Sequence, residues 1–346
     1  MIATAVALGL VAVVWLVWRS ETVVFVLLDR MVADALTSDA LGDLPDGIHV
    51  MLCGAGSPLP DPKRSGTCVA VQAGTRLYVV DAGTNGARNL GRFGVNAGRV
   101  ESVLLTHAHS DHFDGLGELG MVRWLNGSHA EPLPVHGPPV VAEVVAGFNR
   151  AYAPDIGYRT AHQGSRVAPP SGGGLRAIPF PLPADGQLAT VLERPEGLRI
   201  SVFRVSHEPV SEAVGYRFDY KGRIVVVSGD TVKSANLIRH AQGADLLVHE
   251  ALSDRIADRI ASAAEAVGAD GPARMMRDIS SYHATPVEAA EAAAEAGVGH
   301  LLFYHIAPAL PVSALERVFL SGVADVYDGP VTLGVDGTTV SLSVVE

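Results

Sequence analysis

The stretch VLLTHAHSDH, residues 103–112, decides how the rest of this 346-residue chain is interpreted. It begins as a short apolar strand and continues into a loop that holds three histidines and one aspartate within six residues. Side chains on a loop at the end of a strand can turn toward one point, and imidazole and carboxylate groups are the ligands that zinc takes in catalytic sites. One catalytic zinc usually takes three protein ligands. The four candidates therefore predict two metal ions that share this loop: His107, His109, Asp111 and His112.

The composition excludes several classes of protein. Apolar residues make up 48% of the chain, so it can bury a large core and is not intrinsically disordered. The net charge of −11 disfavours binding to nucleic acid through a broad basic surface, because phosphate contacts need clustered lysine and arginine. Cys53 and Cys68 are too few for a disulfide scaffold. They could pair across adjacent strands in an oxidising compartment, but two unpaired core cysteines are favoured.

Residues 1–37 are predicted to form a membrane anchor and its juxtamembrane segment. The run at residues 2–18 contains no charge, and Trp15 and Trp18 suit a membrane interface. A buried core helix or a signal peptide would give a similar run, but no cleavage site of small residues follows it. A polar linker at residues 38–47 then precedes a domain at residues 48–346. We expect a membrane-anchored protein with this domain outside the cytoplasm, and a cytoplasmic orientation remains open because the flanking charges are few.

Beyond residue 46, short β-branched runs alternate with helical patterns, which is typical of a layered α/β protein. A helix is predicted over residues 254–267, and another starts at Pro286, where Thr285 is a suitable cap and Glu288 lies in the first turn. Residues 164–197 are rich in proline and glycine and are predicted to form a long surface loop.

The histidine loop resembles the signature loop of the metallo-β-lactamase fold, a four-layer αβ/βα sandwich of two similar halves, here preceded by the N-terminal apolar helix. Further motifs follow in the order found in the ribonuclease Z branch of that family, which also includes sequences called arylsulfatases. They are VSHEPVSEAVGYRF with His207, SGDT with Asp230, LLVHEA with Glu250, YHATPVEAA with His283 and FYHIAP with His305. The resemblance extends over residues 48–340 and implies the fold more strongly than the substrate.

Carried over residue by residue, this resemblance assigns ligands to each of two zinc ions. One ion would be held by His107, His109 and His207, the other by Asp111, His112 and His305, and Asp230 would bridge both. Manganese or iron would also suit these donors. Asp81, which follows another apolar strand, could support the metal loop.

The resemblance also implies a hydrolytic mechanism. A hydroxide that bridges the metals would be the nucleophile, because bound metal lowers the pKa of water, and Asp111 would orient it. Glu250 and His283 would form a pair that serves departure of the leaving group. The chain reads HAT at residues 283–285, where the family usually has HST.

The resemblance leaves two hypotheses about the substrate. We expect a dinuclear zinc-dependent hydrolase of a small phosphodiester or sulfate ester, and the sequence does not separate phosphorus from sulfur because both tetrahedral anions suit two zinc ions. The alternative is a tRNA 3′-processing endoribonuclease of the ribonuclease Z type.

Departures from the nuclease pattern favour the small ester. The residues after His305 are IAPAL, where those nucleases usually have a serine followed by Arg-Tyr, and residues 164–197 contain only three arginines. With the acidic net charge, these departures make nucleic acid an unlikely partner. The resemblance is compatible with a homodimer.

Overall fold

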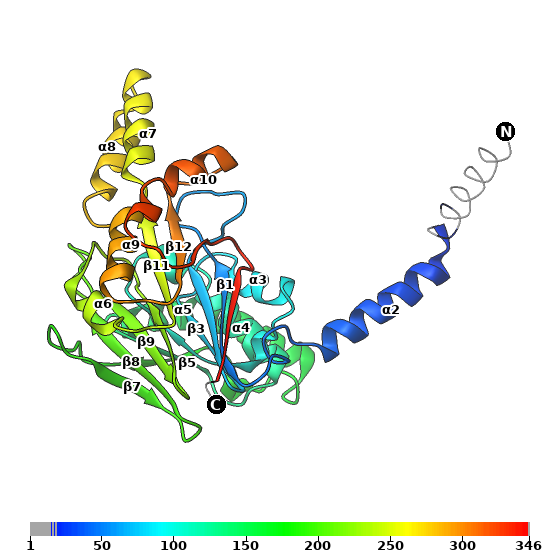
Figure 1. Ribbon diagram of the computed structural model, residues 1–346. Coiled ribbons are helices and arrows are strands. Elements are labelled where there is room, and N and C mark those ends of the chain that lie inside the picture. Colours follow the sequence, from blue (N-terminus) through cyan, green and yellow to red (C-terminus); the bar gives the residue numbers. More distant parts are fainter. Residues whose placement is uncertain (1–14, 16, 18, 345–346) are drawn as a thin grey trace, which may run out of the picture.

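The computed structural model describes residues 15, 17 and 19–344, and its strands form two seven-stranded sheets (Figure 1). The first sheet has the strand order β14-β1-β2-β3-β4-β5-β6, and the second has the order β13-β12-β11-β10-β9-β8-β7. The strands of the first sheet are β1 (Gly47–Gly54), β2 (Cys68–Ala73), β3 (Arg76–Val80), β4 (Val100–Leu104), β5 (Leu133–Gly137), β6 (Leu175–Pro179) and β14 (Thr339–Ser343). Those of the second are β7 (Ala189–Glu193), β8 (Leu198–Arg204), β9 (Val214–Tyr220), β10 (Arg223–Val227), β11 (Leu246–Leu252), β12 (Leu301–Ala307) and β13 (Val331–Leu333).

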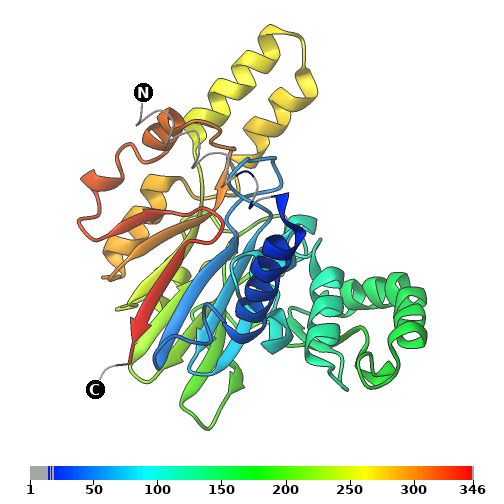
Figure 2. The same cartoon turned by 90° about the vertical axis from the view of Figure 1, so that its right-hand side faces the viewer.

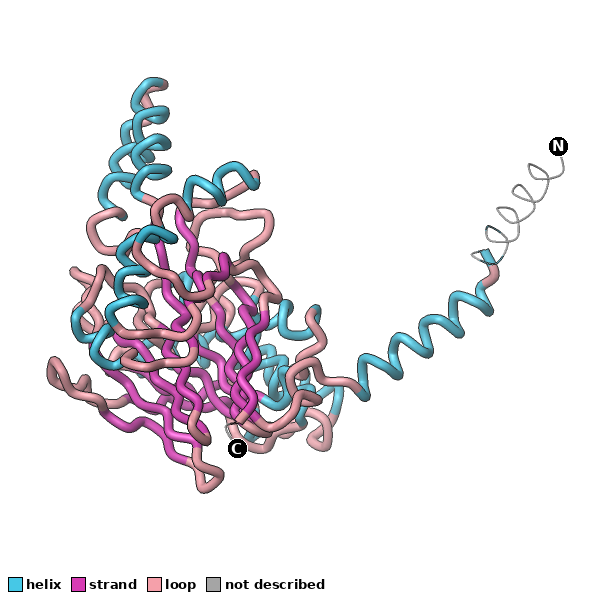
Figure 3. The backbone as a smooth tube through the Cα atoms, in the orientation of Figure 1, coloured by secondary structure: helices cyan, strands magenta, loops and turns pink. Residues whose placement is uncertain are grey.

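Helices cover the outer face of each sheet, so that the strands lie between them (Figure 3). The first sheet is covered by α3 (Gly86–Arg92), α4 (Leu116–Gly127) and α5 (Val141–Gln163). The second is covered by α6 (Ala235–His240), α9 (Pro286–Glu295) and α10 (Ser313–Phe319). Two further helices, α7 (Asp254–Ala266) and α8 (Asp270–Ile279), form a hairpin that projects from one end of the sandwich (Figure 2).

Alternation along the strands builds the core in layers. On β1, Ile48 and Val50 point into the core between the two sheets, whereas Met51 and Cys53 pack toward the helices that cover the first sheet. The first sheet and its helices are called the first half below, and the second sheet and its helices the second half. The same period of two lets inner strands such as β1, β2, β11 and β12 bury both faces, because a strand's side chains point alternately to opposite sides. This arrangement confirms the layered α/β sandwich that the sequence predicts.

Parallel strand pairing places the histidine loop and other loops that follow the strands at one edge of the sheets. In the first sheet β3, β4, β5 and β6 are parallel, and in the second β10, β11, β12 and β13 are parallel. Loops that leave the carboxyl ends of parallel strands gather at one edge of the sheet, where ligands of open α/β sheets bind. The histidine loop follows β4 at such an edge.

Two local predictions are wrong. Cys53 and Cys68 form a disulfide between β1 and β2, in place of two unpaired cysteines. Residues 164–197 include β6 and β7 as well as turns, and each of these strands lies at the edge of its sheet. Edge strands tolerate proline and partly exposed side chains, so their apolar pattern is weak in the sequence.

The predicted N-terminal apolar helix lies mostly outside the described residues. Among residues 15, 17 and 19–344, no helix is long and apolar enough to cross a membrane. Helix α2 (Glu21–Thr37) buries none of its side chains and extends away from the sandwich (Figure 1). The segment after it contacts the first half: Leu41 is buried, and Asp39 pairs with Arg99 at 2.6 Å.

Candidate metal centre

The histidine loop is held in place by Asp81, a fully buried aspartate directly after β3. Its carboxylate accepts hydrogen bonds from the main-chain N–H and the hydroxyl of Thr106, both at 2.8 Å, and from Nδ1 of His112 at 2.8 Å. Thr106 Oγ1 in turn lies 3.0 Å from Nδ1 of His107. With both Nδ1 atoms donating, the Nε2 atoms of His107 and His112 present lone pairs, as metal-binding imidazoles do.

The second half contributes three residues from separate segments. His207 lies in the loop after β8, Asp230 follows β10, and His305 is part of β12. His305 has a positive φ of 42° and is the extra residue of a β-bulge, since Glu250 pairs with Tyr304 while the next residue pairs with Ile306. A bulge of this kind redirects a side chain, here away from both hydrophobic cores.

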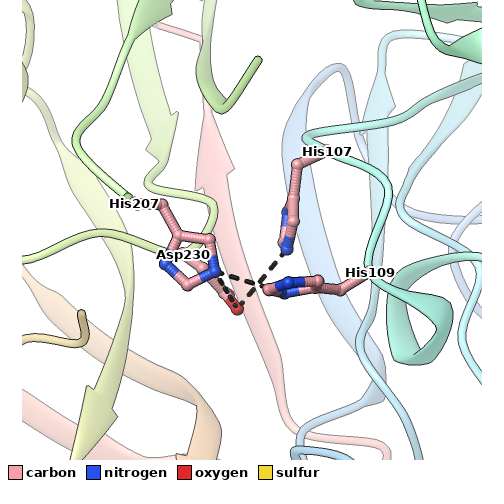
Figure 4. A group of neighbouring side chains, drawn as sticks. All are labelled: His107, His109, His207 and Asp230. Atoms are coloured by element: carbon pink, nitrogen blue, oxygen red, sulfur yellow. Dashed lines mark hydrogen bonds and ion pairs between the residues drawn. The ribbon is translucent and has the colours of Figure 1, made fainter. Parts of the chain in front are cut away.

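His207 and His305 meet the histidine loop at the carboxylate of Asp230. Figure 4 shows Asp230 with His107, His109 and His207. The Oδ2 atom of Asp230 lies 3.3 Å from Nε2 of His112 and 3.4 Å from Nε2 of His305. The Nε2 atoms of His107 and His207 are each 3.8 Å from the same oxygen. One aspartate therefore faces histidines from both halves of the molecule.

Two groups of donor atoms match the two ligand sets carried over from the family. His107, His109, His207 and Asp230 form one group, and Asp111, His112 and His305 form the other, with the atoms of each group within 4.8 Å of one another. In the first group His207 Nε2 and His109 Nδ1 are 3.2 Å apart, and in the second His305 Nε2 and Asp111 Oδ2 are 3.2 Å apart. Two ligands of one tetrahedral zinc lie about 3.4 Å apart when each bond is about 2.0–2.1 Å.

The buried polar atoms at this centre fit a cation. Nε2 of His107, Nε2 of His112 and Oδ1 of Asp230 are buried and have no hydrogen-bond partner in the described part of the chain. An unsatisfied buried polar atom is costly, and divalent ions bind such nitrogen and oxygen donors. Burial and the neighbouring His112 hold the pKa of His107 well below its ordinary value, so its imidazole is neutral and can donate a lone pair.

Glu250 and His283 form a pair beside this centre. Glu250 is fully buried on β11, and its Oε1 lies 3.0 Å from Nδ1 of His283 and accepts main-chain hydrogen bonds from Thr231 and Ala284. Burial alone would lower the pKa of His283, but the charge and hydrogen bond of Glu250 outweigh it and raise the pKa to about 9. The His283 ring stacks on that of His305 with 5.4 Å between centroids.

Two features of the site are missing from the sequence-based prediction. The carbonyl of Tyr282 accepts a hydrogen bond from Nδ1 of His207 at 2.9 Å, and a main-chain contact of this kind leaves no residue signature. The second missing feature is helix α8. Its signal lies in Ala273, Met276 and Ile279, which show the spacing of an amphipathic helix. The helix forms one wall of a cleft of about 100 Å³ over the donor cluster, here named the apolar cleft.

The comparisons with known proteins agree on the family. A model described as the beta-lactamase superfamily domain matches residues 76–306. The chain is 38% identical to a protein named Ribonuclease Z from Mycobacterium avium, over 84% of this chain and 96% of that protein. It is 35% identical to Ribonuclease Z of Mycobacterium bovis over the same shares.

Solved structures show the same fold. The short form of human tRNase Z aligns with a TM-score of 0.61 at 20% identity, covering 85% of this chain and 99% of that one. The metallo-beta-lactamase fold protein YhfI from Bacillus subtilis aligns with a TM-score of 0.60 at 22% identity, covering 86% of this chain and all of that one.

The fold and the donor cluster thus define a metallo-β-lactamase-fold hydrolase with a divalent-metal site. Within that superfamily, the chain belongs with the ribonuclease Z proteins.

This membership corrects three predictions. Relatives named Ribonuclease Z overturn the preference for a small ester, and none of those described above supports an arylsulfatase. The expectation that nucleic acid is an unlikely partner is wrong for the same reason: a net charge of −11 sums the whole chain and does not report the local field at a metal centre. The prediction of a membrane-anchored, extracytoplasmic domain is corrected as well: no helix within residues 15, 17 and 19–344 could cross a membrane, and the matching relatives are named Ribonuclease Z.

Proposed function

We propose that this protein is a metal-dependent endoribonuclease of the ribonuclease Z type, which hydrolyses a phosphodiester bond at the 3′ end of precursor tRNA. The observation that carries the proposal is the 38% identity to a Ribonuclease Z that this chain covers over 96% of its length. The donor cluster at Asp230 supports it, because hydrolysis of a phosphodiester needs strong stabilisation of negative charge.

In this proposal the two donor groups would hold two divalent ions, taken to be zinc, and Asp230 would serve as a ligand in both groups. Such ions supply Lewis-acid chemistry, which favours deprotonation of water and stabilises negative charge on the phosphate. Asp81 and Thr106 keep His107 and His112 in the orientation needed for binding. The carbonyl of Tyr282 does the same for His207.

Asp111 is proposed to orient the attacking water. Its Oδ2 lies 3.2 Å from His305 and 3.5 Å from Nε2 of His112, and its carboxylate borders the open space above the cluster. A carboxylate at that position can accept a hydrogen bond from water and fix its approach to phosphorus.

His283 is proposed to give a proton to the leaving oxygen. Its Nδ1–H donates to Glu250, so the Nε2–H of the protonated imidazole is the one left free on the side of the cleft. The charge of Glu250 favours the protonated imidazole, and donation to the departing alkoxide of a ribose lowers the barrier because that alkoxide is a poor leaving group.

The test is cleavage of a precursor tRNA that carries a 3′ trailer. We expect the full chain, loaded with zinc, to cut once at the base of the trailer, to lose this activity on chelation and to regain it when zinc is restored. Asp230→Ala is the inactive control, and a precursor extended at its 5′ end alone is the substrate control. Absence of 3′ cleavage by protein loaded with zinc, manganese or iron would contradict the proposal.

A further inference from the structure

The apolar cleft has two unlike sides. Its floor is polar and holds His109, Asp111, Asp230, His283 and His305. Its walls are formed by the apolar side chains of Leu59, Leu252, Met275, Met276 and Ile279. A group attached directly to a phosphate at the donor cluster therefore meets an apolar surface within the same cleft.

Helix α8 supplies three of these wall residues and packs against α7. Met276 is 4% exposed and anchors the helix, whereas Met275 is 46% exposed and offers its side chain to the cleft. On the outer side, Arg277 forms an ion pair with Glu265 of α7 at 2.7 Å. The wall is thus part of the projecting hairpin in Figure 2.

The wall residues favour an uncharged, planar group of the substrate. No lysine or arginine is among the described residues that line the cleft, so it offers no counter-charge to a second phosphate. Methionine is flexible and polarizable and packs well against aromatic rings. Unpaired nucleobases stack on apolar and aromatic side chains with little regard to sequence.

A second, larger cleft shares Asp111, Leu59, Ser57 and Pro58 with the first, and the rest of its lining is different. It is bordered by polar groups that include Ser65, Asn85, Ser110 and Asp114. His283 lines the apolar cleft and not this polar one. A phosphodiester at the donor cluster therefore has an apolar surface with a proton donor on one side and a polar surface on the other.

We infer that the apolar cleft is a subsite for the unpaired nucleobase of the nucleotide whose oxygen is the leaving group, with Met275 and Ile279 in contact with that base. The inference rests on the proposed function. It adds that the enzyme binds the base on the leaving-group side of the scissile bond. The polar cleft takes the sugar and phosphate on the other side.

The experiment uses precursor tRNAs with one abasic nucleotide, placed on either side of the scissile bond, and measures kcat/KM. For the unaltered chain, loss of the base on the leaving-group side is expected to lower kcat/KM about tenfold, as typical base stacking would. Loss of the base on the other side should change it less than about twofold.

The variants Met275→Ser and Ile279→Ala test the wall itself. With either variant, kcat/KM for the intact substrate should fall by most of that tenfold factor. Removal of the base on the leaving-group side should then lower kcat/KM no further, because the base no longer has its contact. Met275→Ser is expected to fold, since the side chain is half exposed. Val267→Ser is the matched control: it lies at the tip of the same hairpin, is 79% exposed and does not line the cleft.

The outcomes separate the two proposals. RNA cleavage with equal penalties on both sides, or with the full penalty retained in both wall variants, overturns the base subsite alone. A chain that cleaves none of the intact precursor tRNAs overturns the proposed function and, with it, this inference.

Discussion

The first half of the molecule brings four residues to the metal centre on one loop after β4, whereas the second half brings three from three separate segments. In the first half the spacing within the chain already groups the donors. In the second half the donors are 23 and 75 residues apart, from His207 to Asp230 and from Asp230 to His305. The half whose donors are scattered along the chain nevertheless supplies Asp230, the carboxylate that faces both donor groups.

The largest expected effect is on metal content and cleavage rate, and it should differ between a ligand of the second half and one of the first. Asp230→Ala should lose both metal ions and lower precursor tRNA cleavage at least about a thousandfold, because its carboxylate faces both donor groups. His109→Ala, in the first half, should lose one ion. Metal content by mass spectrometry and cleavage rate are the readouts, with circular dichroism to check the fold.

Asp114→Ala is the matched control for metal content alone, since Asp114 follows the same loop and belongs to neither donor group but borders the polar cleft. If Asp230→Ala kept the metal content of the unaltered chain, the idea of a shared carboxylate would be wrong.

Next in size is the proton donor of the second half. His283→Ala is expected to slow cleavage of RNA by about 10²–10⁴-fold, the usual range for general acid catalysis. The nitrophenyl ester bis-p-nitrophenyl phosphate should be affected far less, because nitrophenolate departs without a proton. Glu250→Gln should show the same pattern, since Glu250 holds His283 through Nδ1. Equal slowing of both substrates would show that His283 does not protonate the leaving group.

A smaller effect distinguishes how each half holds its ligands. Asp81→Asn in the first half should weaken metal affinity about 10–100-fold, the usual result of removing an outer-shell partner. Tyr282→Phe in the second half should leave affinity unchanged, because the hydrogen bond to His207 comes from the main-chain carbonyl. Competition with a chromogenic chelator measures both, and a similar loss in the two variants would argue against this distinction.

The smallest effect concerns stability, where the segment before β1 attaches to the first half. Burial would raise the pKa of Asp39, but hydrogen bonds from Arg99 and Gly42 outweigh it and lower the pKa below its ordinary value of 3.8. A lowered carboxyl pKa stabilises the fold above about pH 4, and this contribution is lost as the pH falls through the folded-state value. Asp39→Asn should therefore cost about 1 kcal/mol at pH 7 and less at pH 3, measured by urea unfolding. An equal cost at both pH values would refute the ionic contribution.

Much of the fold and part of the centre could be predicted because their signals are local. The strand-to-loop pattern at residues 103–112 and the apolar run of β1 are set by neighbouring residues, and the capping box at Thr285 and Glu288 forms as the sequence indicates. The edge strands β6 and β7, the helix α8 and the disulfide were harder, because weak periodicity or long-range pairing gives them little local signature.

A layered α/β chain with a cluster of metal-type donors on one loop follows from local sequence alone, since strand patterns and close spacing act over a few residues. The meeting of His207, Asp230 and His305 with that loop does not, because their convergence depends on two sheets packing face to face. The tertiary structure also decided the bulge that turns His305 out of the core and the apolar wall that α8 places over the cluster. Both features arise from contacts between segments far apart in the chain.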